Sequence, residues 1–369
     1  MKWKYNTSKV LKVMSAIRNI ARNINAVFPP TTIDDIVRKF VALSPVKERL
    51  RSKDATALYP IEVIRGYSIY NRLPNRQQAF KELSDSKYAI ASIDSSYHSP
   101  GAHGYIPFIV HNVGIWYVDY NNEVGGEDSE VFADIKVSYG DMRERIWMKQ
   151  NEAKVLRNLV KLLNGELNFV MLDESLSIGY TISWSNTDRE EYAHVIADYV
   201  NFLIDNNIIP LGIYYTRSID IVRGMRDMGV VSDDEFKNSQ IPDKMILNKI
   251  LGCGDRSPIF NVYSYAHMKT GLELNAIYVK VGDYNTLRVE FPAKTLKLGK
   301  DVIEDIHRVV LLESIIGDGY PYPLQASHEN AVLTSEVRDA IVEVFSEVLG
   351  IRNELYVSSK EMSKRWPLA

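Results

Sequence analysis

Cysteine is nearly absent from this sequence of 369 residues, which contains only Cys253. One cysteine cannot form an internal disulfide, and it cannot build a zinc finger, another cysteine-built metal site or a thiol redox motif. Any metal in this protein must therefore be held by oxygen or imidazole ligands. A reducing cytoplasm is the compartment we expect.

Long apolar runs are also missing, since no uninterrupted run is long enough to span a bilayer. Lys12, Arg18 and Arg22 interrupt the apolar positions near the N-terminus, which does not fit the core of a signal peptide. The formal net charge of -3 argues against a protein that coats nucleic acid through overall positive charge. It does not exclude a local basic channel. We expect a soluble, cytoplasmic protein with no membrane association.

The composition, with 46% hydrophobic and 25% charged residues, is typical of a folded globular protein. A chain of this length accommodates two domains, or one large domain with an appendage. There is no internal repeat and no low-complexity linker. We therefore predict an N-terminal helical segment over residues 1–80 and one elaborated domain over 81–369.

The first 33 residues contain six Lys and Arg residues and no acid. Apolar residues recur at helical spacing from Val10 to Phe28, which predicts a basic amphipathic helix that ends at Pro29-Pro30. Such a helix fits a membrane surface, a nucleic acid, a partner subunit or the protein's own core. The sequence leaves these four roles open. Thr32 resembles the N-cap of a second helix.

After residue 87 the pattern changes to short apolar runs separated by loops rich in Gly, Pro, Asn and Asp. Strands are predicted over 88–94, 113–118, 132–139, 167–172 and 209–215, and helices over 144–163, 188–205 and 219–228. The order β-β-β-α-β-α-β-α indicates a mixed sheet flanked by helices, the α/β order of the ribonuclease H-like fold, in which the first strand lies beside the fourth. C-terminal elaborations follow, with strands over 258–263, 274–281 and 287–291 and helices over 301–315, 326–333 and 335–349.

Two aspartates stand at matching places in this order. Asp94 follows Ala-Ile-Ala-Ser-Ile, and Asp173 follows Phe-Val-Met-Leu. If the first and fourth strands are neighbours, both carboxylates lie at one sheet edge, where open α/β sheets bind ligands. They would repel each other unless a divalent cation such as magnesium or manganese lay between them. The alternative is that each Asp caps a turn.

Glu152 lies on the apolar stripe of the helix predicted over 144–163, four residues after Met148 and three before Val155. A carboxylate that faces inward needs a partner. The sequence does not decide between a salt bridge to an Arg or Lys and a metal ion.

A third cluster runs from Gly319 to Val332. Two X-Pro steps hold the backbone extended and fix the direction of Tyr320. His328 follows at the start of a predicted helix, where an imidazole can ligate a metal, transfer a proton or contact a phosphate. A purely structural histidine is the alternative.

With these residues assembled, the sequence resembles the NurA family of nucleases, whose gene usually accompanies that of the hexameric translocase HerA. The resemblance covers about residues 80 to 335. It rests on Ile93-Asp94-Ser95-Ser96, Glu152, Leu172-Asp173-Glu174-Ser175-Leu176 and the segment from Tyr320 to Val332. One departure is Ser95, since many relatives have Gly at that place.

The resemblance implies that Asp94, Glu152, Asp173 and His328 form a metal-binding catalytic set, with Tyr320 beside it. It further implies manganese-dependent (or magnesium-dependent) cleavage of DNA, as 5'-3' exonuclease and single-strand endonuclease. It also implies a homodimer that works with a HerA-like hexameric ATPase in processing DNA ends for repair. Our hypothesis is that Asp94 bridges two ions about 4 Å apart, while Asp173 holds one and Glu152 the other. His328 would complete a ligand shell or deliver a proton.

Basic residues near these acids are candidates for holding DNA, and aromatic residues are candidates for stacking on bases. The basic candidates are Arg143, Arg145, Lys149, Arg217, Arg223 and Arg226. His98 and His103 lie in a stretch rich in Gly and Pro, and we expect them to contact substrate at most, since their spacing does not indicate a metal site.

Two further functions fit the same residues. One is a non-catalytic dimeric adaptor of a DNA translocase, which the presence of all four ligands disfavours. The other is a structure-selective DNA or RNA endonuclease, or a strand-transfer enzyme, of the same fold.

Overall fold

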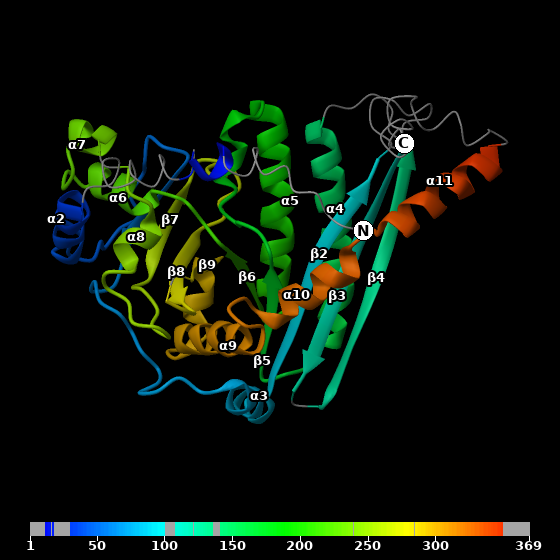
Figure 1. The fold of residues 1–369 in the computed structure, drawn as a ribbon, viewed down its shortest axis with the longest axis horizontal. Helices are drawn as coiled ribbons and strands as arrows, with labels where there is room; N and C mark the ends of the chain where they lie inside the picture. Colours follow the sequence, from blue (N-terminus) through cyan, green and yellow to red (C-terminus); the bar gives the residue numbers. More distant parts are fainter. Residues whose placement is uncertain are drawn as a thin grey trace.

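The computed structural model describes residues 12–15, 17, 30–99, 108–120, 122–135, 141–238, 240–283 and 285–349. Within these residues the strands form a nine-stranded sheet in the order β1-β7-β8-β9-β6-β5-β2-β3-β4 (Figure 1). The strands are β1 (Thr56–Pro60), β2 (Tyr88–His98), β3 (Phe108–Asp119), β4 (Val124–Ile135), β5 (Leu167–Leu172), β6 (Ile208–Tyr214), β7 (Phe260–Ser264), β8 (Leu274–Lys280) and β9 (Thr286–Pro292).

The sheet is mixed, with its parallel pairs in the middle. β2 runs parallel to β5, and β5 runs parallel to β6, while the other neighbouring pairs are antiparallel. Parallel neighbours need a crossover, which the helices between these strands provide. The prediction that the first strand of the ribonuclease H-like order lies beside the fourth is confirmed, since these are β2 and β5.

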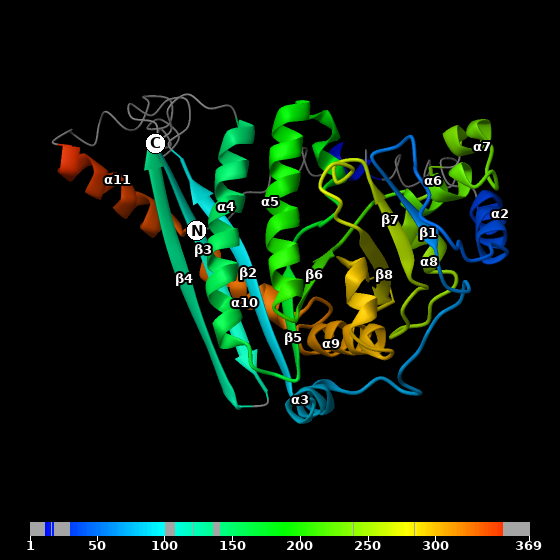
Figure 2. The same ribbon diagram turned by 180° about the vertical axis from the view of Figure 1, so that it is seen from behind.

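Helices cover both faces of the sheet. α4 and α5 stand side by side over one face, while α3, α9 and α10 lie over the other (Figures 1 and 2). The helices are α2 (Pro30–Val41), α3 (Arg76–Asp85), α4 (Asp141–Leu159), α5 (Asn186–Asp205), α6 (Asp220–Asp227), α7 (Asp233–Asn238), α8 (Asp243–Leu247), α9 (Val302–Ile316), α10 (Tyr322–Ala331) and α11 (Ser335–Leu349). Short 3-10 turns occur at Val160–Leu162, Gly179–Ser183 and Ala293–Lys297.

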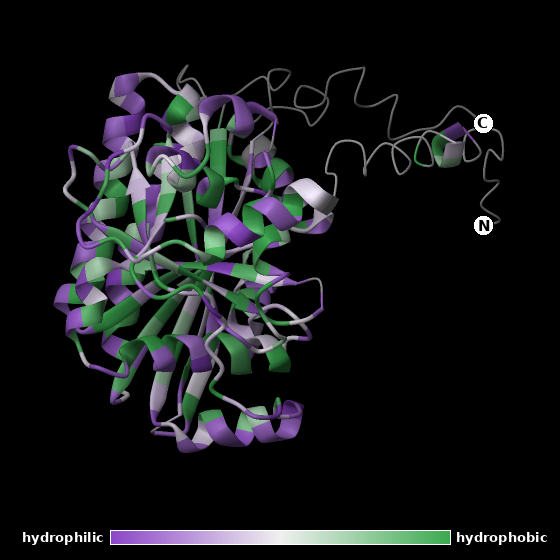
Figure 3. Ribbon diagram, turned by 90° about the vertical axis from the view of Figure 1, so that its left-hand side faces the viewer, coloured by the Kyte–Doolittle hydropathy of each residue, from purple (hydrophilic) through white to green (hydrophobic). Residues whose placement is uncertain are grey.

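The alternation of side chains along the strands divides the core into two layers. On β5, Val170 and Leu172 pack toward the face covered by α4 and α5, whereas Phe169 and Met171 pack toward α9. This follows from the two-residue period of a strand, and burial of both faces explains the continuous apolar run. Figure 3 shows the long hydrophobic stretches on the strands between helices of mixed hydropathy.

Several elements differ from the sequence-based expectation, among them β2, which was predicted to end at Asp94 but continues to His98 because its pairing with β3 extends that far. Residues 56–60 form β1, which pairs antiparallel with β7, where only helices were expected before residue 81. β4 begins at Val124 although its first half contains two glycines and several acids, because pairing with β3 outweighs a weak intrinsic preference for strand. α10 begins at Tyr322, since Pro323 is tolerated in the first helical turn.

The basic helix expected over residues 10–28 lies almost entirely outside the described residues. Among the described helices, none combines the length and apolar character that crossing a membrane requires.

Candidate active site

Asp94 and Asp173 meet because their strands are parallel neighbours in register. Ile93 of β2 pairs with Leu172 of β5, so the residue that follows each lies at the same edge of the sheet. Both aspartates line a cavity of about 170 Å³. Burial raises the pKa of Asp173, the Asp94 carboxylate raises it further, and a hydrogen bond from Tyr320 opposes the shift. Asp173 therefore senses the negative charge of Asp94.

Tyr320 lies over this pair from the segment that precedes α10. Its hydroxyl donates to Asp173 Oδ1 at 2.6 Å, and it also lies 3.2 Å from the carbonyl oxygen of Ile213. Burial and the nearby Asp173 raise the pKa of Tyr320, which keeps the hydroxyl protonated as a donor. The ring of Tyr215 stacks on the Tyr320 ring with centroids 5.3 Å apart.

His328 reaches Asp94 from the last part of α10, not from the start of a helix as expected. Its Nδ1 lies 2.6 Å from Asp94 Oδ2. Because a carboxylate only accepts hydrogen bonds, this contact assigns the proton to Nδ1. The side chain is 64% exposed, so its other face is open to solvent.

Close packing between α10 and β3 makes this contact possible. Gly114 is the partner of Asp94 in the β2–β3 register. A Cβ at Gly114 would lie 2.3 Å from the backbone oxygen of Ser327 and 2.3 Å from the backbone nitrogen of Ala331. The absence of a side chain at this position therefore lets α10 approach the sheet and bring His328 to Asp94.

Glu152 faces the same cavity from α4, and its partner is a lysine. Lys149, one helical turn earlier and 8% exposed, forms an ion pair with Glu152 Oε2. The ammonium also lies 2.8 Å from Glu174 Oε2. Ser95, on the next strand position after Asp94, donates its hydroxyl to Glu152 Oε1 at 2.6 Å. The salt bridge, one of the two partners left open by the sequence, is therefore present.

Two residues behind this cluster were not identified from the sequence. Tyr199 donates to Glu174 Oε1 at 2.7 Å and so fixes the second acid that Lys149 contacts. His111 of β3 is fully buried, with its Nε2 3.9 Å from Glu152 Oε1. Burial lowers the pKa of His111 to about 4, so the ring is neutral. The sequence contains one indirect signal for each. Glu174, the partner of Tyr199, is an acid directly after Asp173, and His111 is a polar residue inside an apolar strand.

The donor set at this edge fits a divalent cation in part. Asp94 and Asp173 supply hard oxygen ligands whose mutual repulsion a cation would relieve. As the side chains stand, no group of three or more His, Cys, Asp or Glu in the described residues is arranged to enclose a metal. Glu152 is held by Lys149.

The basic candidates fall into three groups. Arg143 pairs with Glu191 on α5, and Arg223 and Arg226 form ion pairs with Asp220 and Asp54, so these three are engaged within the protein. Lys149 belongs to the buried cavity. Arg145 and Arg217 are exposed and form no ion pair with any described residue.

Of the two histidines expected as substrate contacts, the structure describes His98 but not His103. His98 lies at the end of β2, and its ring packs edge-on against Phe108 with centroids 6.1 Å apart. His103 lies outside the described residues.

Comparison with known proteins relates this fold to nucleases. The model of the NurA domain family matches residues 88–333, a span that contains Asp94, Glu152, Asp173, Tyr320 and His328. A search among curated proteins found no significant match. Among solved structures, the NurA nuclease from Sulfolobus solfataricus aligns at 16% identity over 95% of this chain and 98% of that chain, with a TM-score of 0.54.

Two further structures align with lower scores. A second NurA structure has 9% identity over 95% of this chain and 99% of that chain, with a TM-score of 0.43. The catalytic domain of human endonuclease V has 10% identity over 77% of this chain and 92% of that chain, with a TM-score of 0.35. The Sulfolobus structure establishes a common fold, and the two lower scores carry no structural argument.

Proposed function

The chain belongs to the NurA domain family, and from that membership we propose that it is a metal-dependent deoxyribonuclease. The observation that carries the proposal is the meeting of Asp94 and Asp173 in one cavity, with Tyr320 and His328 hydrogen-bonded to their oxygens. Phosphodiester hydrolysis needs cations that neutralise charge where the phosphate reacts, and positioned carboxylates of this kind could hold such cations.

We propose that Asp94 and Asp173 hold a manganese or magnesium ion. A released Glu152 is the further ligand that would extend the site to two ions, and His328 would either complete a ligand shell or deliver a proton. A bound divalent ion supplies neutralisation of the phosphate charge and activation of a water molecule. Hard carboxylate oxygens suit both metals.

The chain's own residues position these groups. Tyr320 fixes the rotamer of Asp173 through its hydroxyl, and the stacked ring of Tyr215 fixes Tyr320. His328 orients Asp94 through Nδ1 and leaves Nε2 on the exposed side, where it can donate a proton to a leaving oxygen when the ring is charged. Arg145 and Arg217 are the proposed contacts to the DNA backbone, and Arg143 joins them if DNA displaces its acidic partner.

The finer assignments are part of the same proposal. We propose 5'-3' exonuclease and single-strand endonuclease activity, in a homodimer that works with a HerA-type hexameric translocase during DNA end processing for repair. These assignments follow from the family resemblance. They are tested separately, by product analysis on end-labelled DNA and by co-purification with such a translocase.

The direct test is a cleavage assay. Purified protein is incubated with labelled single-stranded and double-stranded DNA and RNA, with manganese, magnesium or a chelator. We expect DNA cleavage that requires the metal. Asp94→Asn preserves side-chain volume while it removes the anionic ligand, so it should abolish cleavage and leave the fold intact. An Asp94→Asn protein with near-normal activity would overturn the assignment.

The Lys149–Glu152 ion pair favours one alternative, a non-catalytic adaptor. If Lys149 permanently neutralises Glu152, the site lacks a third carboxylate ligand. The same assay separates the two functions, since an adaptor cleaves neither DNA nor RNA under any metal condition.

A further inference from the structure

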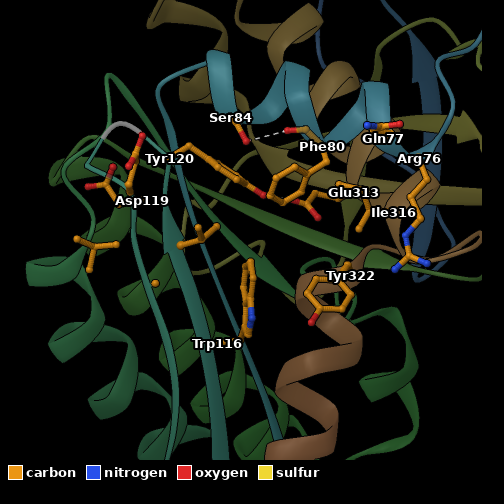
Figure 4. A pocket seen from close by; sticks show the side chains of 14 residues that line it. Arg76, Gln77, Phe80, Ser84, Trp116, Asp119, Tyr120, Glu313, Ile316 and Tyr322 are labelled. Atoms are coloured by element: carbon orange, nitrogen blue, oxygen red, sulfur yellow. Dashed lines mark hydrogen bonds between the residues drawn. The ribbon is translucent and has the colours of Figure 1, made fainter.

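A second cavity lies on the same face of the sheet as α10. It has a volume of about 900 Å³, which lies in the range of small-molecule sites in proteins. Figure 4 shows its lining, which comes from α3, β3, the β3–β4 turn, α9 and the start of α10. None of the proposed catalytic residues lines it.

Aromatic side chains form much of its wall. Trp116 of β3 and Tyr322 of α10 meet edge to face with ring centroids 5.7 Å apart. Phe80 projects from α3 toward them and is 58% exposed, although it is a large apolar side chain (Figure 4). Exposed aromatic rings around one hollow provide surfaces on which a flat ring can stack.

A buried acid lies in the same wall and has no role in the proposed reaction. Glu313 is 1% exposed, and burial raises its pKa to about 8. At neutral pH its carboxyl group is therefore mainly protonated and offers one donor and one acceptor. Within the described part of the chain, its hydrogen-bond partner is the hydroxyl of Tyr120 at 3.3 Å, which leaves capacity for a ligand.

The charges around the cavity are separated between its ends. Arg76 is the basic residue of the lining, is exposed, and forms no ion pair with any described residue. Figure 4 shows Arg76 beside Ile316 and Tyr322 at one end and Asp119 at the other. Two acids of the lining lie away from Arg76, at the β3–β4 turn: Glu123, which is exposed, and Asp119, which accepts a hydrogen bond from Asn122. A phosphate is therefore favoured at the end with Tyr322.

Trp116, in the wall of this cavity, lies near the candidate active site. Trp116 pairs with Ser92, and Gly114 pairs with Asp94, so the two places lie two residues apart on neighbouring strands. Two residues of strand span about 7 Å. Tyr322 also follows Tyr320 by two residues.

We propose that this cavity binds one unpaired nucleotide of a DNA strand, with its base between Phe80 and the Trp116–Tyr322 pair, its edge at Glu313 and its phosphate at Arg76. The inference rests on the proposed function for its choice of DNA, and it adds a binding site outside the proposed metal cavity.

Binding is measured on the full-length chain in EDTA, so that no metal-dependent cleavage occurs. The probes are single-stranded oligonucleotides, each with one 2-aminopurine at a different position. We expect quenching at one position, because stacking quenches this base. Phe80→Ala should weaken binding roughly 5- to 150-fold, the range of a lost stacking contact. Arg76→Gln should weaken binding and reduce the salt slope by about 1.

Tyr265→Ala is the matched control, since Tyr265 is an aromatic residue that is 42% exposed and does not line this cavity. It should bind like the unmodified chain. Equal affinities for Phe80→Ala, Arg76→Gln and the control overturn the inference, and so does the absence of any quenched position.

Free deoxynucleoside monophosphates separate this inference from the proposed function. Nucleotide binding that depends on Phe80, in a protein that cleaves no DNA, supports the cavity and overturns the nuclease. If the protein cleaves DNA and Phe80→Ala binds nucleotides like the unmodified chain, the nuclease is supported and the cavity assignment is overturned. If the protein binds neither nucleotides nor oligonucleotides, the cavity assignment is overturned. A protein partner is then the expected occupant of the apolar wall of the cavity.

Discussion

Lys149 forms an ion pair with Glu152 inside the cavity that Asp94 and Asp173 line, so a lysine ammonium contacts one of the proposed metal ligands. Under the proposed function, the Lys149 ammonium and a divalent ion would compete for the Glu152 carboxylate. Metal binding at Glu152 therefore has to displace Lys149, which retains Glu174 as its second partner.

Lys149→Met tests this competition. In EDTA the variant leaves Glu152 and Glu174 without the Lys149 ammonium, so we expect a loss of unfolding free energy of about 3–5 kcal/mol. Manganese should restore more stability to the variant than it adds to the unmodified chain, since Glu152 is then free to ligate. Thermal unfolding with and without manganese measures both effects.

Lys161→Met is the control, because Lys161 is exposed on the turn after α4 and forms no ion pair with any described residue. Equal manganese stabilisation of the Lys149 variant and the unmodified chain would show that the lysine and the metal do not share Glu152.

Tyr320→Phe removes one hydroxyl and keeps the ring that stacks on Tyr215. Asp173 then loses a hydrogen bond that fixes its carboxylate. Loss of such an orienting contact typically lowers metal affinity or activity 10- to 100-fold, so we expect a fall in cleavage rate of about that size. The stability should change by only about 1 kcal/mol.

Tyr215→Phe provides the comparison. Its hydroxyl donates to the carbonyl oxygen of Gly319 and does not touch Asp173, so cleavage should be nearly unchanged. Cleavage that falls equally in both variants would assign the effect to the shape of the 319–322 segment and not to Asp173.

The sequence predicted the central part of the fold because both faces of the sheet are buried. β5 was predicted at its observed bounds, since Phe169 to Leu172 have no polar residue to interrupt the run. β1 was missed because a five-residue strand before the domain has no periodic signal of its own, and only its pairing with β7 identifies it.

The candidate site was predictable where it depends on the order of the strands and on a helical stripe. Register brings Asp94 beside Asp173, and periodicity turns Glu152 inward. The partner of Glu152 was not predictable. Lys149 lies three residues before Glu152, but a lysine at that spacing is equally common on the solvated face of a helix. The 900 Å³ cavity has no sequence signal, since its lining comes from residues scattered between 76 and 322.

Gly114→Ala tests whether the approach of α10 positions His328. The added Cβ meets two backbone atoms of α10 at 2.3 Å, and backbone cannot move aside as a flexible side chain can. We expect a loss of stability of about 1–3 kcal/mol and a displacement of His328 from Asp94. Cleavage should fall more than the small loss in folded fraction explains.

Gly299→Ala is the matched change, since a Cβ there meets nothing within 4 Å. Denaturant unfolding gives the stabilities of both variants, and cleavage is measured where both are folded. A Gly114 variant that cleaves like the Gly299 variant would contradict the positioning role.

Glu313→Gln tests the protonated acid in the second cavity through the pH dependence of stability. The pKa of Glu313 is raised from 4.5 to about 8 by burial. Between these values the unfolded chain has released a proton that the folded chain retains, so the free energy of unfolding falls as pH rises. The contribution is complete below pH 4.5 and lost above about pH 8.

Glutamine keeps an acceptor for Tyr120 and does not titrate. As pH rises from 5 to 8, the free energy of unfolding of the variant should therefore rise relative to that of the unmodified chain, by about 1–4 kcal/mol. Urea unfolding at several pH values measures the gain, and Glu304→Gln, at an exposed place on the same helix, serves as the reference. Parallel stability curves for Glu313→Gln and the unmodified chain would mean that Glu313 is ionised in the folded protein, and the donor assigned to the cavity wall would be lost.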